Sequence, residues 1–223
     1  MICNLNMNTT NTIRIGKELG VDPNVILETS HGRRSIDVLK LLAPEKANWE
    51  YVCKMEGLMP TKFGSGAVEI PGARSLCASL EEASPKVPWA IVTSGTSPLV
   101  NGWLGILDLP KPHHLVSAEM VEHGKPDPEG YLKGAKELGL DPTKLLVLED
   151  SPAGIKAGKD AGCRVLGIAS THTAKQVKDA GADWVVEDLR SVKMVQSGKD
   201  GSVTLAIANG WTEDGQDITR STL

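Results

Sequence analysis

Apolar residues recur at spacings of three and four along the N-terminal third of the chain. From about Thr12 to Gly66 these positions fall on one face of successive helices, and no strand-like run interrupts them. Asp22-Pro23 is typical of a helix start, and Ala43-Pro44 of a helix end or restart. The pattern therefore predicts a small all-helical unit over residues 13–70.

After Pro71-Gly72 the pattern changes to short apolar runs that alternate with helical stretches. This alternation predicts a parallel sheet with helices on both faces, and ligands bind beyond the carboxyl ends of the strands in such sheets. We expect an α/β core over residues 71–210. The predicted strands are Trp89–Thr93, His114–Ser117, Lys144–Glu149, Arg164–Ile168 and Trp184–Val186, and the predicted helices are Ala73–Ala83, Pro128–Leu138, Pro152–Ala161 and Ala174–Ala180.

The two ends of the chain give weaker patterns. Ser202–Ile207 alternates in the manner of an edge strand or hairpin arm, whereas residues 211–223 are polar and predict a flexible tail. Residues 1–12 predict at most a degenerate or truncated first strand of the core.

Composition narrows the class of protein. The 223 residues are 40% hydrophobic and 23% charged, with a formal net charge of −4, which is typical of a folded domain. The basic residues are scattered, so a nucleic-acid partner is not expected. No apolar run is long enough to span a membrane. The oligomeric state is not determined by the pattern, and a monomer is the default expectation.

The four cysteines, Cys3, Cys53, Cys77 and Cys163, lie far apart in the sequence. Their spacing indicates neither a zinc site nor a disulfide framework. We therefore expect a reducing, cytoplasmic compartment.

The first candidate site lies at the end of the first predicted core strand. Thr93 is followed by Ser94 and Gly95, which offer hydroxyl groups and backbone N–H groups where an anion binds. An ordinary strand-to-helix turn, capped by a hydroxyl, is the alternative interpretation.

A second candidate is Lys125, in the segment Gly124-Lys125-Pro126-Asp127-Pro128. The two prolines restrict the backbone, and a rigidly held ammonium suits neutralisation of phosphate charge. A capped helix start with a solvated lysine would give the same residues.

Two adjacent carboxylates, Glu149 and Asp150, close the apolar strand that precedes Ser151-Pro152. Adjacent carboxylates at the mouth of a parallel sheet are costly to leave unpaired, and a hard cation such as Mg²⁺ relieves that cost. The alternative is that they cap the following helix. The pattern favours a magnesium site.

Taken in chain order, Thr93, Lys125 and Glu149-Asp150 resemble the second, third and fourth motifs of haloacid dehalogenase-like phosphatases that carry a small helical cap. The resemblance covers about Ile15 to Val186. It implies a Mg²⁺-dependent phosphomonoesterase in which Thr93 holds a phosphoryl oxygen and Lys125 neutralises charge near the nucleophile. It also implies that Glu149 and Asp150 hold the metal ion.

Within the cap, the segment from Ser30 to Asp37 resembles the fungal glycerol-phosphate and 2-deoxyglucose-phosphate phosphatase group. The resemblance implies that the cap reads a small sugar or polyol phosphate, with His31, Arg33 and Arg34 as candidate substrate contacts. A solvated helix start is the alternative interpretation of these three residues.

The family's first motif, Asp-x-Asp-Gly-Thr, is missing before the cap. The nearest segment, Leu5 to Thr10, has Asn6 and Asn8 where the family has its nucleophile and its general acid. Asparagine neither forms an acyl-phosphate nor shuttles a proton. The alternative function is therefore that of a non-catalytic relative that binds a phosphate metabolite or a partner protein. A truncated or mis-spliced start of the chain is an alternative explanation for the missing motif. No Gly-x-Ser-x-Gly elbow supports a serine or cysteine hydrolase.

Overall fold

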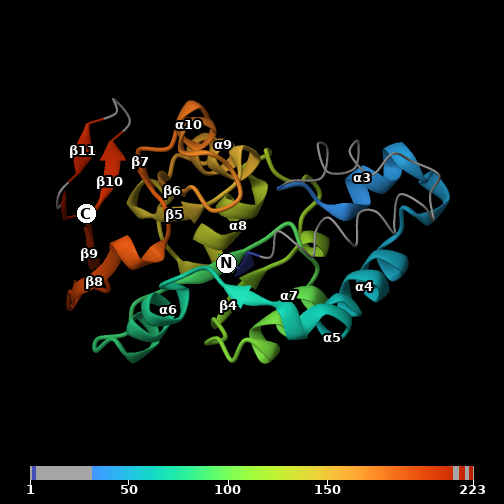
Figure 1. Ribbon diagram of the computed structural model, residues 1–223, viewed down its shortest axis with the longest axis horizontal. Coiled ribbons are helices and arrows are strands. Elements are labelled where there is room, and N and C mark those ends of the chain that lie inside the picture. Colours follow the sequence, from blue (N-terminus) through green and yellow to red (C-terminus); the bar gives the residue numbers. More distant parts are fainter. Residues whose placement is uncertain (1, 4–31, 213–215, 219–220, 223) are drawn as a thin grey trace.

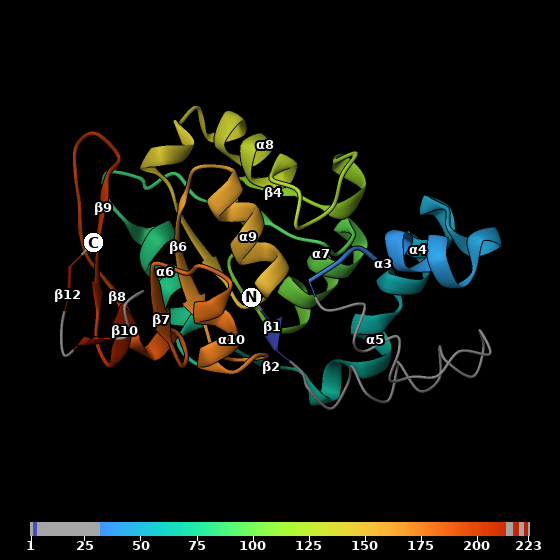
Figure 2. The same ribbon diagram turned by 90° about the horizontal axis from the view of Figure 1, so that it is seen from above.

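The computed structural model describes residues 2–3, 32–212, 216–218 and 221–222. A helical cap lies at one end of this part of the molecule, and strands from the C-terminal region lie at the other (Figures 1 and 2). The described cap elements are α3 (Ser35–Leu42), η1 (Pro44–Lys46), α4 (Trp49–Gly57), α5 (Met59–Phe63) and η2 (Gly64–Gly66). These helical elements lie within residues 13–70, the range of the helical unit expected from the sequence.

The core alternates strands and helices, as predicted. Its first half consists of β2 (Val68–Glu69), α6 (Ala73–Glu82), β3 (Ala90–Val92), α7 (Ser97–Ile106), β4 (His114–Val116), η3 (Ala118–Met120) and α8 (Glu129–Leu138). The second half consists of η4 (Pro142–Lys144), β5 (Leu146–Glu149), α9 (Pro152–Asp160), β6 (Arg164–Ile168), α10 (Ala174–Asp179), β7 (Trp184–Val186) and η5 (Leu189–Ser191).

The strands form separate sheets rather than one continuous sheet. Strands β3 and β4 make a parallel pair, whereas β5, β6 and β7 pair in parallel in a five-stranded sheet. No ladder joins β3 to β5 among the described residues. The first strand, β1 (Ile2–Cys3), pairs antiparallel with β2 and lies outside both parallel sheets.

Side chains alternate between the two faces of the parallel strands. Along β6, Val165 packs in a cluster with residues of α8, α9 and α10, whereas Leu166 and Ile168 pack with residues of α6. This period of two explains the continuous apolar runs in the sequence, because both faces of the sheet are covered.

The C-terminal region forms an antiparallel addition. It consists of β8 (Val192–Ser197), β9 (Val203–Ile207), β10 (Gly210–Thr212), β11 (Asp217–Ile218) and β12 (Ser221–Thr222). The predicted edge strand is β9, which pairs with β8 and β12, while β10 pairs with β7. In contrast to the flexible tail expected over residues 211–223, strand pairing includes Trp211, Thr212 and parts of the segment beyond them.

No helix in the described part of the chain is both long and apolar enough to cross a membrane.

Candidate active site at the carboxyl ends of the strands

Lys125 brings two strand ends together. Its Nζ donates to the backbone oxygen of Val92 at 3.2 Å, at the end of β3, and forms an ion pair with Oε1 of Glu149, at the end of β5. Both side chains are largely buried, with 11% and 7% exposed. Lys125 therefore links the carboxyl ends of β3 and β5.

Glu149 is surrounded by hydrogen-bond donors. The hydroxyl of Tyr131 donates to Oε1 at 2.7 Å, and Oε2 accepts from the backbone N–H groups of Asp150 and Ser151 at 2.9 and 3.1 Å and from the Ser151 hydroxyl. A Cβ at Gly154 would lie 2.0 Å from Oε1. A glycine is required there because the carboxylate rests against the first turn of α9.

The pKa values of the two neighbouring carboxylates, Glu149 and Asp150, are shifted in opposite directions. Burial by itself would raise the pKa of Glu149, but the charge and hydrogen bond of Lys125 and the Tyr131 hydroxyl outweigh it and lower that pKa to about 2. For Asp150, burial and then the charge of Glu149 raise the pKa above its usual range. Glu149 is thus the carboxyl that remains ionised to lower pH, and Asp150 is the one that is protonated at higher pH.

Asp150 is oriented by the segment that follows β6. The hydroxyl of Thr171 lies 3.1 Å from Oδ2 of Asp150 and 3.2 Å from its backbone oxygen, and Nδ1 of His172 lies 3.0 Å from the same backbone oxygen. The segment after β6 is thus the third strand end that contributes to the site, after those of β3 and β5.

Thr93 and its neighbours form a turn that contacts the cap. Oγ1 of Thr93 accepts the Gly95 N–H at 3.1 Å, which is the strand-to-helix turn of the alternative interpretation. No acceptor for its hydroxyl hydrogen is seen among the described residues, so this group could donate to an anion. The Ser94 hydroxyl donates to the backbone oxygen of Gly32 at 2.9 Å. A Cβ at Gly32 would lie 2.6 Å from Oγ of Ser151. The start of the cap therefore lies between two strand ends of the core.

The three cap residues predicted to contact substrate have different positions. Arg33 is exposed and follows Gly32 directly. Arg34 is buried, with 4% exposed, and hydrogen-bonds to the core rather than projecting into solvent. His31 lies outside the described residues.

Of the two carboxylates predicted to bind magnesium, only Asp150 has an oxygen free of hydrogen bonds from the described residues. No group of three or more His, Cys, Asp or Glu side chains in the described part of the chain could hold a metal ion. Both oxygens of Glu149 are saturated by donors, whereas the described residues make no hydrogen bond to Oδ1 of Asp150. Because Mg²⁺ is often held by one or two carboxylates together with substrate phosphate and water, Asp150 fits as a ligand.

Sequence reasoning missed Tyr131 and Thr171. Tyr131 lies in the first turn of α8 and is 8% exposed. In the sequence it fits the apolar pattern of a core residue, and nothing there marks its hydroxyl as part of a site. Thr171 lies after β6, where the polar run Ser170 to Thr173 follows a strand end. That polar run, at the same edge of the sheet as Asp150, was the signal available in the sequence.

Comparisons with known proteins agree on one family. Residues 61–162 match the profile described as haloacid dehalogenase-like hydrolase. The chain is 42% identical over 180 residues to glycerol-1-phosphate phosphohydrolase 1 of Saccharomyces cerevisiae, covering 78% of this chain and 72% of that protein. It is 35% identical over 218 residues to 2-deoxyglucose-6-phosphate phosphatase 2 of the same yeast, covering 90% and 88%. Hexitol phosphatase A of Escherichia coli is 33% identical over 180 residues, covering 79% and 81%.

Solved structures share the fold. A HAD hydrolase of family IA, variant 3, from Entamoeba histolytica superposes with a TM-score of 0.71 at 20% identity, covering 86% of this chain and 91% of that chain. A hydrolase from Pseudomonas syringae gives a TM-score of 0.67 at 23% identity, covering 82% and 87%. The predicted α/β class is confirmed.

Proposed function

Because this chain belongs to the haloacid dehalogenase-like hydrolases, as its motifs predicted, we propose that it hydrolyses the phosphomonoester of a small sugar or polyol phosphate. The observation that carries the proposal is that Lys125 contacts both Val92, the residue before Thr93, and Glu149, the residue before Asp150. The relatives named as glycerol, hexitol and deoxyglucose phosphatases support the substrate class.

In this proposal the residues of the site share the work of binding and neutralising a phosphoryl group. The Thr93 hydroxyl donates to one phosphoryl oxygen, and the Lys125 ammonium neutralises part of the negative charge of the phosphoryl group. Glu149 holds that ammonium in place and is itself held by the Tyr131 hydroxyl. Thr171 orients Asp150. Bound through Asp150, Mg²⁺ would neutralise charge on the transferring group.

The cap provides the contacts for the leaving group in the same proposal. Gly32 lies against Ser94 and Ser151, so the exposed Arg33 beside it is the cap residue best placed to meet a sugar or polyol phosphate. His31 remains a candidate contact. The proposed substrate is a small phosphorylated metabolite. A cytoplasmic location is proposed as well, because the spacing of the cysteines indicates no disulfide framework.

A second function is favoured by one feature of the sequence. Asn6 and Asn8 stand where the family has two aspartates, and they lie outside the described residues. A chain without that nucleophile would bind a phosphate metabolite without turning it over.

Phosphate release separates the two functions. The purified chain is incubated with Mg²⁺ and a panel of glycerol, hexitol and deoxyhexose phosphates, with Asp150→Ala as the control. We expect release from at least one substrate and its loss in Asp150→Ala. No release from a chain shown to be folded, together with substrate binding by calorimetry, would replace hydrolysis with the binding function.

A further inference from the structure

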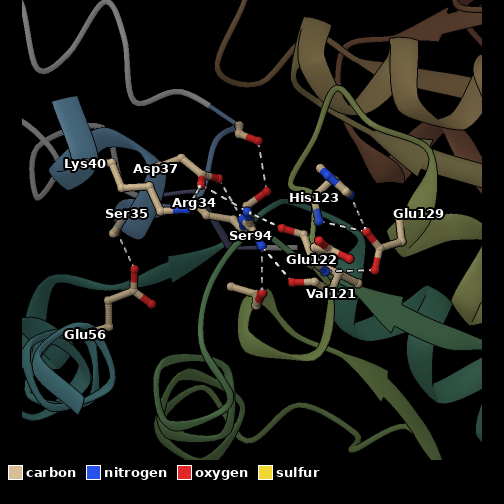
Figure 3. A network of polar contacts seen from close by, with 12 residues as sticks. Arg34, Ser35, Asp37, Lys40, Glu56, Ser94, Val121, Glu122, His123 and Glu129 are labelled. Atoms are coloured by element: carbon tan, nitrogen blue, oxygen red, sulfur yellow. Dashed lines mark hydrogen bonds and ion pairs between the residues drawn. The ribbon is translucent and has the colours of Figure 1, made fainter. Parts of the chain in front are cut away.

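Arg34 lies at the junction of cap and core. It immediately precedes α3 and is only 4% exposed, although arginine is rarely buried without partners. Figure 3 shows its guanidinium enclosed between the cap residue Asp37 and the backbone of the core segment that includes Val121 and Glu122.

All five N–H groups of Arg34 are engaged. Nε and one terminal nitrogen donate to the Asp37 carboxylate at 2.7 and 3.0 Å. The terminal nitrogens also donate to the backbone oxygens of Val121, Glu122 and Ala118 at 2.8, 3.0 and 3.3 Å. No donor is left for a substrate, so the guanidinium functions as a connection within the protein.

The core segment contacted by Arg34 is also held from its other side. The carboxylate of Glu129, in the first turn of α8, accepts the backbone N–H groups of Glu122 and His123 at 2.8 and 2.7 Å. Oxygens of this segment therefore point to the cap, and its N–H groups point to α8. The segment is therefore held both by Arg34 of the cap and by Glu129 of α8.

Arg34 also contacts the residue that precedes Lys125. A Cβ at Gly124 would lie 2.5 Å from Nε of Arg34 and 3.0 Å from its Cδ and Cγ. The backbone oxygen of Gly124 accepts the Asp127 N–H at 3.1 Å, so Lys125 lies within a tight turn whose first residue packs against the guanidinium.

We propose that Arg34 is a positioning residue that couples the docking of the cap to the placement of Lys125. With the cap docked, the guanidinium fixes Gly124, and the Lys125 ammonium then reaches both Val92 and Glu149. The importance of this coupling for hydrolysis rests on the proposed function. The coupling itself is measured without turnover.

The test measures the chemical reactivity of Lys125 in the full chain. Wild type and Arg34→Ala are exposed briefly to an amine-acylating reagent, and the modification of each lysine is followed by mass spectrometry. We expect acylation of Lys125 to increase about tenfold in Arg34→Ala, because several hydrogen bonds of a charged donor are lost next to it. Arg33→Ala is the matched control, since Arg33 is adjacent but exposed, and should leave that rate unchanged.

Cys163 reports general unfolding in the same samples. Its thiol is buried in the core, 4% exposed, and is alkylated only when that core opens. Faster acylation of Lys125 with unchanged alkylation of Cys163 supports the proposal. An unchanged Lys125 rate overturns it, and so does a proportional rise at both residues, which would make Arg34 a purely structural contact.

A second variant tests the contact at Gly124. Gly124→Ala should increase acylation of Lys125 in the wild-type background, because the added methyl collides with Arg34. In Arg34→Ala the same substitution should have little further effect, since the obstructing side chain is gone. Additive effects of the two substitutions would contradict a connection through this contact.

Discussion

Single residues of the site have roles that their neighbours define. Glu149 is an anion whose oxygens are saturated, Asp150 is a carboxyl with a raised pKa, and Tyr131 supplies a buried hydroxyl. The sequence predicted Lys125, Glu149 and Asp150 because strand ends and turn residues mark them. It did not predict which carboxylate pairs with the lysine, because that depends on contacts from α8 and from the start of α9.

Tyr131→Phe tests the hydroxyl that supports Glu149. Its removal deletes one hydrogen bond to a buried charged group, so we expect the free energy of unfolding to fall by roughly 1.5–3 kcal/mol. Urea unfolding measures this loss. Tyr51→Phe, in the cap helix α4, is the matched control and should change stability by less than about 0.5 kcal/mol. Equal effects of the two variants would contradict the role of the hydroxyl.

Glu149 should make stability depend on pH in a definite direction. Its pKa is about 2 in the folded chain, below the ordinary value of 4.5, so it stabilises the fold above pH 4.5, and this contribution is lost as the pH falls toward 2. Asp150, with a raised pKa, acts in the opposite direction and partly compensates. The urea midpoint should therefore fall more between about pH 6 and pH 3 for wild type than for Glu149→Gln. Parallel curves would refute the assignment.

At the scale of elements, most boundaries could be predicted because strands covered on both faces read as continuous apolar runs. The helix α7 was not predicted: it begins with Ser97-Pro98 and contains Gly102 and Gly105, which lower intrinsic helix propensity. Its start is stabilised instead by carboxylates distant in sequence, since Glu56 accepts the Thr96 N–H at 2.7 Å and Glu119 accepts the Ser97 N–H at 2.9 Å. Tertiary contacts of this kind leave no local pattern.

Gly154→Ala and Gly105→Ala form a matched pair of helix substitutions. In α9 the new methyl would collide with the Glu149 carboxylate, so we expect a loss of about 1–3 kcal/mol in the free energy of unfolding. In α7 nothing lies within 4 Å of a Cβ at Gly105, and alanine there should stabilise the chain by roughly 0.5–1 kcal/mol. Thermal or urea unfolding distinguishes the two signs. A stable Gly154→Ala would show that the carboxylate does not rest against the helix.

At the scale of the whole molecule, the sequence predicted the α/β class and the cap but not the division of the sheet. Residues 1–12 predicted at most a degenerate first strand of the core, and β1 pairs with β2 outside both parallel sheets. Where that strand would lie instead depends on long-range pairing, which the apolar pattern does not encode.

The division of the sheet predicts lowered stability. Within the described residues β3 pairs with β4 alone and β5 with β6 alone, so one edge of each strand lacks a ladder partner. We expect this chain to unfold at a lower temperature than glycerol-1-phosphate phosphohydrolase 1 of Saccharomyces cerevisiae, measured side by side by calorimetry. A midpoint at or above that of the relative would contradict the expectation.

The position of Lys125 affects how a loss of activity in Lys125 variants is interpreted. One ammonium bonds to Val92 in the two-stranded sheet and to Glu149 in the five-stranded sheet, so it bridges a seam that no described backbone ladder crosses. Under the proposed function, replacing Lys125 would remove both the charge that binds phosphate and the contact that joins the two sheets. Loss of activity at this position therefore measures catalysis and cohesion together, and only a stability measurement on the same variant separates them.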